Sequence, residues 1–515
     1  MRSRLFEFFV PGVMGLVILV GRGDAQQRQS PTAPQQNPTP ATMPPGLQDA
    51  FIRFPLLPGL DAYGDIDGRH LHRYVVEQAA ISRKYRDEGH PQFWGRITGT
   101  SSDAESADWL ADHFKRIGLT DVRSQVIDLP PQWMPQTWTI TASSGATTLQ
   151  LDRSATPAYG TPGTSPDGID VEAVWVGTGS EADFAGRDVR GKAAFMFSMP
   201  LPGSMNHTST LEGGPKRAAE KGAAAVFQVI ALPGNMRNVL YPARVNVPVF
   251  ALGMDDGYAI RDLIGKAASR PPHVRIRLDV RQVPNAKSAL VWGMMPGATD
   301  ETIYVMAHRD GWFDAATDNA SGVATMIGLA EHFAKVPRER RRRTIVFVGL
   351  DGHHNDSGGV GRMWMVEHRD QLFTKTALAI NAEHTSTIQT YFYGEKIRRA
   401  NTYTAQLWYA GGPTRPKLQD VAVRAFQEFG VPIYMEPEQA PPPGDLGRFF
   451  RFVPGVDAGD FNMYFHTDEE TPETVPWTGL EASTRAYARI IDGVNELDLK
   501  DLQRPPEPEP RTARQ

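Results

Sequence analysis

Short apolar runs separated by amphipathic segments dominate residues 283–500. The runs at 302–307, 344–350 and 377–382 are mainly apolar, which is typical of strands that are buried on both faces. Between the first two runs, apolar residues recur at helical spacing over 321–334. This alternation predicts an α/β fold with a mostly parallel sheet and helices on both faces.

Residues 47–154 are predicted to belong to the same domain. Over 107–114 the apolar side chains share one face of a helix, which Gly118 ends. Residues 124–129 alternate as a strand, and 137–152 have the pattern of two strands around a Ser-Ser-Gly turn.

Residues 155–282 interrupt this domain with a second predicted unit of short buried strands and one helix. Its segments VGTGSEADFAGRDVRGKAAFM, KRAAEKGAAAVFQVI and VNVPVFALG resemble the protease-associated domain. The resemblance implies an inserted β-rich domain that acts as a non-catalytic lid or wall on the substrate side.

The two ends of the chain have the composition of processed or unstructured segments. Residues 1–25 combine a charged start, an apolar run at 8–20 that is too short to span a bilayer, and small residues before the end. We therefore expect a signal peptide and an exported protein, periplasmic or secreted, with an uncleaved anchor as the alternative. Residues 26–46 are rich in Gln and Pro and predict a disordered linker, and 501–515 predict a flexible tail.

Composition excludes several classes of protein. Lys and Arg total 54 against 59 for Asp and Glu, a net charge of -5, so a strongly basic nucleic-acid binder is excluded. No run of 18 apolar residues occurs, and we therefore predict no membrane span. Cysteine is absent, which rules out disulfides, thiol nucleophiles and Cys-ligated zinc.

Side chains that bind metal ions follow each of the three apolar runs. The segments after them are, in chain order, His308-Arg309-Asp310, Asp351-Gly352-His353-His354 and Glu383-His384. Because the carboxyl ends of parallel strands meet at one edge of a sheet, we expect these side chains to lie together. A single histidine or carboxylate at a strand end more often has a structural role. Residues of these types at three successive strand ends are poorly explained by coincidence.

The residue types favour zinc. Imidazole and carboxylate together suit this ion, and hydrolytic zinc sites keep a position open for water. Asp318 precedes a predicted helix and is placed to bridge two ions. Asp310, two residues after His308, is placed to orient that imidazole.

Several of these segments resemble the di-zinc exopeptidase family that includes leucyl aminopeptidases, glutamate carboxypeptidase and transferrin-receptor-like proteins. The segments are AHRDGWFDAATDNASGVATMIGLAEHF, TIVFVGLDGHHNDSGG, ALAINAEH, YFHTDEETPETV and GRITGTSSDAESADWLADHFKRIGL. The resemblance implies an exopeptidase with two zinc ions, most simply an aminopeptidase, acting on a peptide or aminoacyl substrate. The oligomeric state stays open.

The resemblance also implies a role for each matching residue. One zinc ion would be held by His308, Asp318 and Glu383. The other would be held by Asp318, His354 and His466. His353 stands where the family has its general-base glutamate.

Two departures from the family pattern bear on activity. The adjacent glutamates of the family are His353 and His354 here, and an aspartate ligand is Glu383. The ligand charge would fall from about -3 to about -2, which favours more acidic bound water but weaker metal retention. A neutral His353 can accept a proton, although nearby cations weaken it as a base. Asp351 and Asp356 are the alternative proton acceptors.

The loss of both glutamates keeps two other functions open. The chain could be a non-catalytic binding protein on a peptidase scaffold, or could catalyse a related metal-dependent acyl transfer such as glutaminyl cyclisation. Asp445, Arg448 and Tyr464 are candidate pocket residues, although packing would explain them equally well.

Overall fold

The computed structural model describes residues 53–200, 207–211, 213–267, 270–354, 359–393, 396–400, 405–409, 416–435, 444–449, 452–459 and 461–502. The predicted signal peptide, the predicted linker and residues 503–515 of the predicted tail lie outside these residues. Within the described part of the chain, none of the helices has the length and apolar character that a membrane crossing requires.

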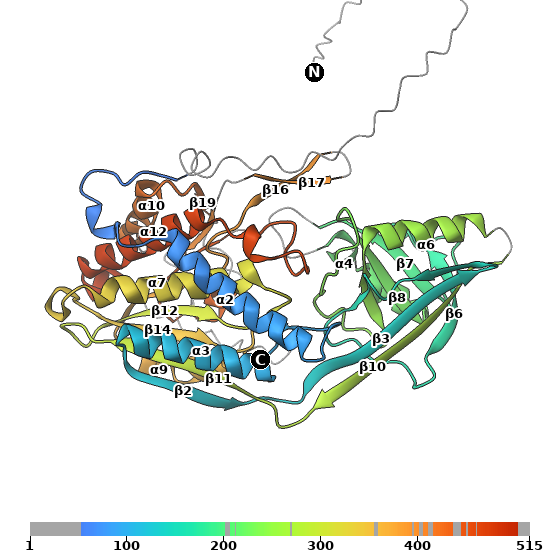
Figure 1. Cartoon of the computed structure of the whole chain (residues 1–515), viewed down its shortest axis with the longest axis horizontal. Helices are drawn as coiled ribbons and strands as arrows, with labels where there is room; N and C mark the ends of the chain where they lie inside the picture. Colours follow the sequence, from blue (N-terminus) through green and yellow to red (C-terminus); the bar gives the residue numbers. More distant parts are fainter. Residues whose placement is uncertain are drawn as a thin grey trace, which may run out of the picture. The chain divides into compact units, whose positions relative to one another are not determined.

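A first sheet carries the predicted apolar runs (Figure 1). Its eight described strands are, in spatial order, β19 (Ile433–Met435), β18 (Ala405–Tyr409), β20 (Gly455–Gly459), β15 (Thr376–Asn381), β12 (Thr302–His308), β14 (Thr344–Leu350), β11 (Lys287–Met295) and β2 (Thr120–Asp128).

The centre of this sheet is parallel and its flanks are mixed. Strands β20, β15, β12 and β14 run parallel to one another. The pairs β11–β14, β11–β2 and β18–β20 are antiparallel. The predicted α/β fold is confirmed, with antiparallel additions on both sides of the parallel core.

Helices cover both faces of the first sheet because alternate residues of its strands point to opposite sides. In β12, Ile303 and Val305 are buried in one apolar core and Tyr304 and Met306 in another. The described helices of this part are α2 (Gly68–Asp87), α3 (Ser101–Ile117), α7 (Gly322–Ala334), α8 (Val360–Glu367), α9 (Arg369–Leu372), α10 (Pro416–Glu428), α11 (Leu446–Phe449), α12 (Trp477–Asn495) and α13 (Leu499–Leu502).

A second sheet lies within the chain segment that precedes β11. In spatial order its described strands are β4 (Thr147–Gln150), β3 (Gln132–Ser144), β10 (His273–Val283), β6 (Ile169–Trp175), β7 (Ala193–Ser198), β8 (Ala225–Ile230), β9 (Val249–Leu252) and β5 (Thr156–Pro157). The described helices are α4 (Thr208–Leu211), α5 (Gly214–Glu220) and α6 (Met254–Lys266). Two small antiparallel pairs, β1 (Gly95–Arg96) with β13 (Gly311–Trp312) and β16 (Gln389–Tyr393) with β17 (Lys396–Ala400), complete the strands.

The second sheet begins earlier in the chain than the predicted insertion at 155–282. The strands β3 and β4 form the predicted hairpin, but β3 pairs along its length with β10 and not with the first sheet (Figure 1). The hairpin that we expected in the segment 47–154 of the peptidase-like domain therefore belongs to the second sheet.

Candidate metal centre

Three neighbouring strands of the first sheet bring their following residues to one place. Strand β12 lies between β14 and β15 and is parallel to both. His308 ends β12, the His353-His354 pair follows β14, and Glu383 follows β15. The carboxyl ends of the strands thus deliver the predicted histidines and the predicted carboxylate to one edge of the sheet.

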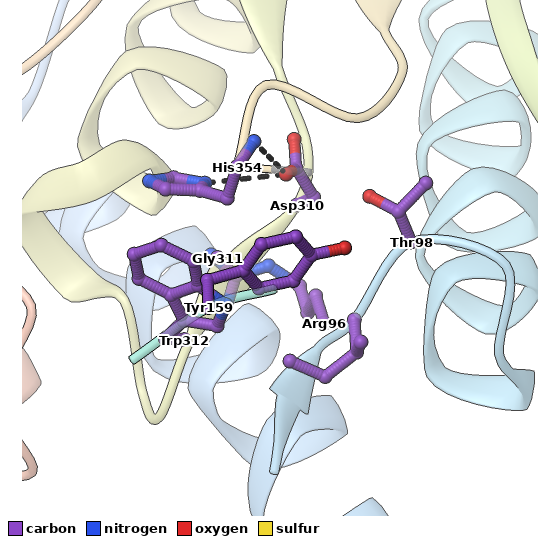
Figure 2. Close-up of a pocket in the computed structure, with 8 residues that line it drawn as sticks. Arg96, Thr98, Tyr159, Asp310, Gly311, Trp312 and His354 are labelled. Carbon is purple, nitrogen blue, oxygen red and sulfur yellow. Dashed lines mark hydrogen bonds and ion pairs between the residues drawn. The ribbon is translucent and has the colours of Figure 1, made fainter. Parts of the chain in front are cut away.

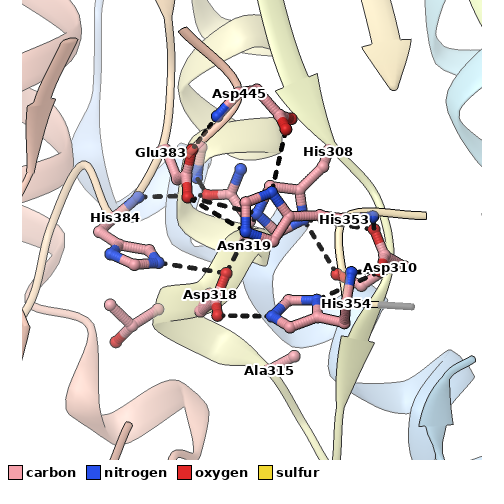
Figure 3. Close-up of polar contacts among 12 residues, drawn as sticks. His308, Asp310, Ala315, Asp318, Asn319, His353, His354, Glu383, His384 and Asp445 are labelled. Atoms are coloured by element: carbon pink, nitrogen blue, oxygen red, sulfur yellow. Dashed lines mark hydrogen bonds and ion pairs between the residues drawn. The ribbon is translucent and has the colours of Figure 1, made fainter. Parts of the chain in front are cut away.

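The carboxylate of Asp318 lies between four imidazoles, three of which, His308, His354 and His384, are labelled in Figure 3. Its Oδ1 lies 3.1 Å from Nε2 of His308 and 3.1 Å from Nε2 of His384. Its Oδ2 lies 2.8 Å from Nε2 of His354 and 3.0 Å from Nε2 of His466. All five side chains are buried. Each oxygen of Asp318 therefore faces two imidazole nitrogens.

Glu383 adds a second carboxylate to this cluster. Its Oε1 lies 3.9 Å from Nε2 of His308 and 3.8 Å from Nε2 of His353. Its Oε2 accepts hydrogen bonds from Nδ2 of Asn381 and the backbone N–H of Asp445, at 2.6 and 3.3 Å. One oxygen is held by the protein, and the other is turned towards the imidazoles.

Two polar groups lie against Nδ1 of His353. Oδ1 of Asp445 is 3.0 Å from it (Figure 3), and Nη1 of Arg362, which also pairs with Asp445, is 3.0 Å from it. Its Nε2 faces Glu383. Burial, and next the positive charge of His308, hold the pKa of His353 well below its ordinary value, so the imidazole is neutral at neutral pH.

Asp310 supports three of the histidines at once. Its carboxylate accepts the backbone N–H groups of His353 and His354, each at 2.9 Å. It also lies 3.4 Å from Nδ1 of His308 and 3.2 Å from Nδ1 of His354. Burial raises the pKa of Asp310, but the contacts with His308 and His354 outweigh burial and hold it well below its ordinary value. A carboxylate on the far nitrogen of a ligating imidazole fixes the ring and its tautomer.

Glu470 fixes two segments of the cluster and was not predicted from the sequence. It accepts the backbone N–H of Asp318 at 2.7 Å and that of His466 at 2.9 Å. Burial, followed by the negative charge of Asp318, raises its pKa to about 8. Its position four residues after His466 was the available signal, but an acid at this spacing is too common to be singled out.

Residues of the second-sheet segment form one wall of the centre. Tyr241 packs edge-on against His466 and Trp312, with ring centroids 5.2 and 5.9 Å apart. The backbone N–H of Val239 donates to the carbonyl of His466 at 3.0 Å. A small pocket beside His354 is lined by Trp312 and by Tyr159, which comes from the same segment (Figure 2).

Of the five remaining candidates, Asp356 alone is not described, and Tyr464 is buried. The carboxylate of Asp351 accepts the backbone N–H of Gly361 at 3.0 Å and belongs to none of the metal-type groups found among the described residues. Asp356 lies outside the described residues. Arg448 is exposed on α11, whereas Asp445 is buried against His353.

The loop that carries Asp310 and Asp318 is anchored by Arg96, a buried residue of β1. Its guanidinium donates to the backbone carbonyls of Arg309, Asp314 and Ala315 at 2.8, 2.9 and 3.0 Å. The planar guanidinium satisfies several carbonyls from fixed directions, which the ammonium of lysine cannot do.

We expect Arg96→Met to lower the free energy of unfolding by roughly 3 kcal/mol, because buried carbonyls would lose their donors at about 1–3 kcal/mol each and such losses are not additive. Urea denaturation followed by circular dichroism measures this change. Arg96→Lys is expected to recover only part of it. An unchanged denaturation midpoint in Arg96→Met would contradict the anchoring role.

The donor atoms suit a divalent cation. Three groups of metal-type side chains have ligand atoms that all lie within 4.8 Å of one another, namely His308 with His353 and Glu383, His308 with Asp318 and His354, and Asp318 with Glu383 and His384. Nε2 of His308, Oδ1 of Asp318 and Nε2 of His384 are buried and make no hydrogen bond within the described residues. Buried polar atoms normally have a hydrogen-bond partner or a metal ion as a partner. Imidazole and carboxylate together are ligands that zinc accepts.

Comparison with known proteins relates the chain to one peptidase family. Residues 291–491 match the sequence profile of Peptidase family M28. This match confirms the resemblance to zinc exopeptidases that the motifs predicted. It includes all the candidate ligands from His308 to His466.

Individual relatives and solved structures support the fold. Aminopeptidase YwaD of Bacillus subtilis (strain 168) is 26% identical over 264 residues, which cover 49% of this chain and half of the relative's length. A Peptidase M28 precursor from Shewanella amazonensis SB2B has 18% identity and a TM-score of 0.64, covering 86% of this chain and all of that one. A zinc aminopeptidase from Bacillus subtilis has 18% identity and a TM-score of 0.59, covering 83% of this chain and 94% of that one.

Proposed function

We propose that this chain is a zinc-dependent metallopeptidase that removes amino acids from the N-terminus of peptides. The observation that carries the proposal is the Asp318 carboxylate, which has two imidazole nitrogens at each of its oxygens. The match to Peptidase family M28 supports the reaction class, and the aminopeptidases among the relatives support the choice of exopeptidase.

Two zinc ions are proposed, with Asp318 shared between them. His308 and Glu383 would complete one ligand set, and His354 and His466 the other. Zinc supplies Lewis acidity, which polarises a peptide carbonyl and makes water more acidic. Asp310 and Glu470 would keep these ligands oriented through the hydrogen bonds described above.

His353 is proposed as the general base in place of the family's glutamate. We propose the tautomer in which Nδ1–H donates to Asp445, so that Nε2, which lies 3.8 Å from Oε1 of Glu383, carries the lone pair. A proton taken up at Nε2 would give an imidazolium that the Asp445 carboxylate stabilises, as in other Asp–His pairs. The alternative of a non-catalytic binding protein receives no support from the comparisons or from the described part of the site.

Metal removal tests the proposed reaction. We expect dialysis against a chelator to abolish hydrolysis of an aminoacyl anilide, because the proposed reaction depends on the Lewis acidity of zinc, and we expect added Zn²⁺ to restore it. Mass spectrometry of peptide products distinguishes stepwise N-terminal removal from other cleavage, and a peptide with N-terminal Gln reveals cyclisation. Hydrolysis that survives complete metal removal would refute the proposal.

Two further assignments rest on sequence patterns. We propose that residues 1–25 direct export, which predicts a mature N-terminus near Gln26 by N-terminal sequencing.

We also propose that the second sheet corresponds to a protease-associated domain. Tyr241 and Tyr159 would then form the substrate-side wall of the centre.

A further inference from the structure

We propose that His384, in addition to the ligands implied by the family, coordinates the metal ion on the Oδ1 side of Asp318. This inference rests on the proposed metal centre. The Nε2 atom of His384 lies 3.1 Å from Oδ1 of Asp318, the same distance as Nε2 of His308. Asp318, Glu383 and His384 also form one of the compact groups of potential ligands.

Each oxygen of Asp318 faces two imidazoles when His384 is included. Oδ2 faces the imidazoles of His354 and His466, and Oδ1 faces those of His308 and His384. Without His384, the Oδ1 side would offer one imidazole and the carboxylate of Glu383. With His384, each side offers Asp318 and two imidazole nitrogens, and the Oδ1 side also offers Glu383.

The contacts of His384 hold its ring in this orientation. Its backbone N–H donates to Oδ1 of Asn319 at 3.2 Å. The ring packs edge-on against Phe461 and Phe465, with centroids 4.6 and 5.3 Å apart. These contacts leave Nε2 directed at Asp318.

A purely structural histidine would satisfy its buried nitrogen with a hydrogen bond. His384 is only 3% exposed, and its Nε2 makes no hydrogen bond within the described residues. Oδ1 of Asp318, which lies 3.1 Å from Nε2 of His384, is also buried without a hydrogen bond within the described residues. A cation bound by the group Asp318, Glu383 and His384 would satisfy both atoms.

The extra imidazole changes the chemistry of the centre relative to the family pattern. Replacing the adjacent glutamates with histidines removes negative charge from the ligands, which weakens cation retention. A further neutral imidazole increases the number of ligand atoms but adds no negative charge to the ligand set. An imidazole-rich set suits Zn²⁺ and Co²⁺ better than Mn²⁺ or Mg²⁺, which prefer oxygen ligands.

The test is His384→Gly in the full chain. The backbone at His384 has φ of +49°, a left-handed conformation that glycine adopts readily, so the variant removes the ring with little backbone strain. Metal per chain is measured by mass spectrometry after equilibration with buffered Zn²⁺. The visible absorption of the Co²⁺-substituted protein reports the ligand set independently of activity.

We expect the wild type to hold two ions and His384→Gly to bind one of them at least about 10-fold more weakly, with a changed Co²⁺ spectrum that added imidazole partly restores. His384→Gln, which keeps a similar volume, serves if the glycine variant does not fold, and the same loss is expected. The matched control is His113→Ala, because His113 is a histidine of α3 with 4% exposure and belongs to none of the ligand groups. Both ions and an unchanged spectrum are expected there.

The outcomes separate this inference from the proposed function. If the wild type binds two ions and hydrolyses peptides while the His384 variants keep wild-type affinity and spectrum, the inference is wrong and the proposed function stands. If the wild type binds no metal at all, both fail.

Discussion

Asp318→Asn is expected to release both metal ions together and to lower peptide hydrolysis by at least about 100-fold. Loss of a residue that only supports a ligand already costs about 10- to 100-fold in affinity or activity. Asp318 contributes both of its oxygens, each within 3.1 Å of two imidazole nitrogens. Removing its negative charge would leave Glu383 as the only carboxylate among the proposed ligands. Metal per chain and kcat/KM for an aminoacyl anilide measure the effect.

Two variants serve as controls for this prediction. His466→Ala removes a ligand from the Oδ2 side alone and is expected to release one ion, not two. Asp492→Asn changes a largely buried acid on α12 that bonds to Tyr63 and is expected to retain both ions. If Asp318→Asn retained two ions at wild-type affinity, the bridging role of this carboxylate would be disproved.

The parallel core of the first sheet could be predicted from the sequence because its signals are local. A strand buried on both faces is mainly apolar, and β12, β14 and β15 each have this composition. Parallel strands then place the residues that follow them at one edge. His308, the His353-His354 pair and Glu383 could therefore be brought together without a structure.

The extent of the second sheet could not be predicted in the same way. Strand β3 has the alternation of an ordinary half-buried strand, and nothing local specifies its partner. It pairs with β10, more than a hundred residues later in the chain. Pairing over such a distance depends on the packing of the whole domain, so the local pattern of β3 and β4 does not specify their place in the second sheet.

The same limit applies to the residues that support the site. The sequence shows that His384 follows Glu383 directly. The direction of the His384 ring, however, depends on a left-handed backbone conformation and on contacts with Phe461 and Phe465. Asp445 reaches His353 from a segment 92 residues away. The spacing of residues along the sequence predicts neither of these contacts.

His353→Ala is expected to lower kcat by about 10²- to 10⁴-fold, the range for loss of a general base, while both metal ions remain bound. The reason is the geometry of the ring, which Asp445 holds through Nδ1 while Nε2 faces the ligand cluster. Single-turnover hydrolysis and metal content are measured on the same preparation. His353→Glu restores the residue type of the family and is expected to be at least as active as the wild type.

The metal content of His353→Ala decides between two roles for this residue. His353 also belongs to a compact group with His308 and Glu383, so it is within reach of a cation as well as of a proton. A base that does not coordinate metal leaves two ions in place when it is removed, and only the rate falls. Loss of an ion in His353→Ala would instead identify His353 as a ligand. Asp445→Asn adds a second criterion, because weaker orientation of a base would lower kcat with the metal content unchanged.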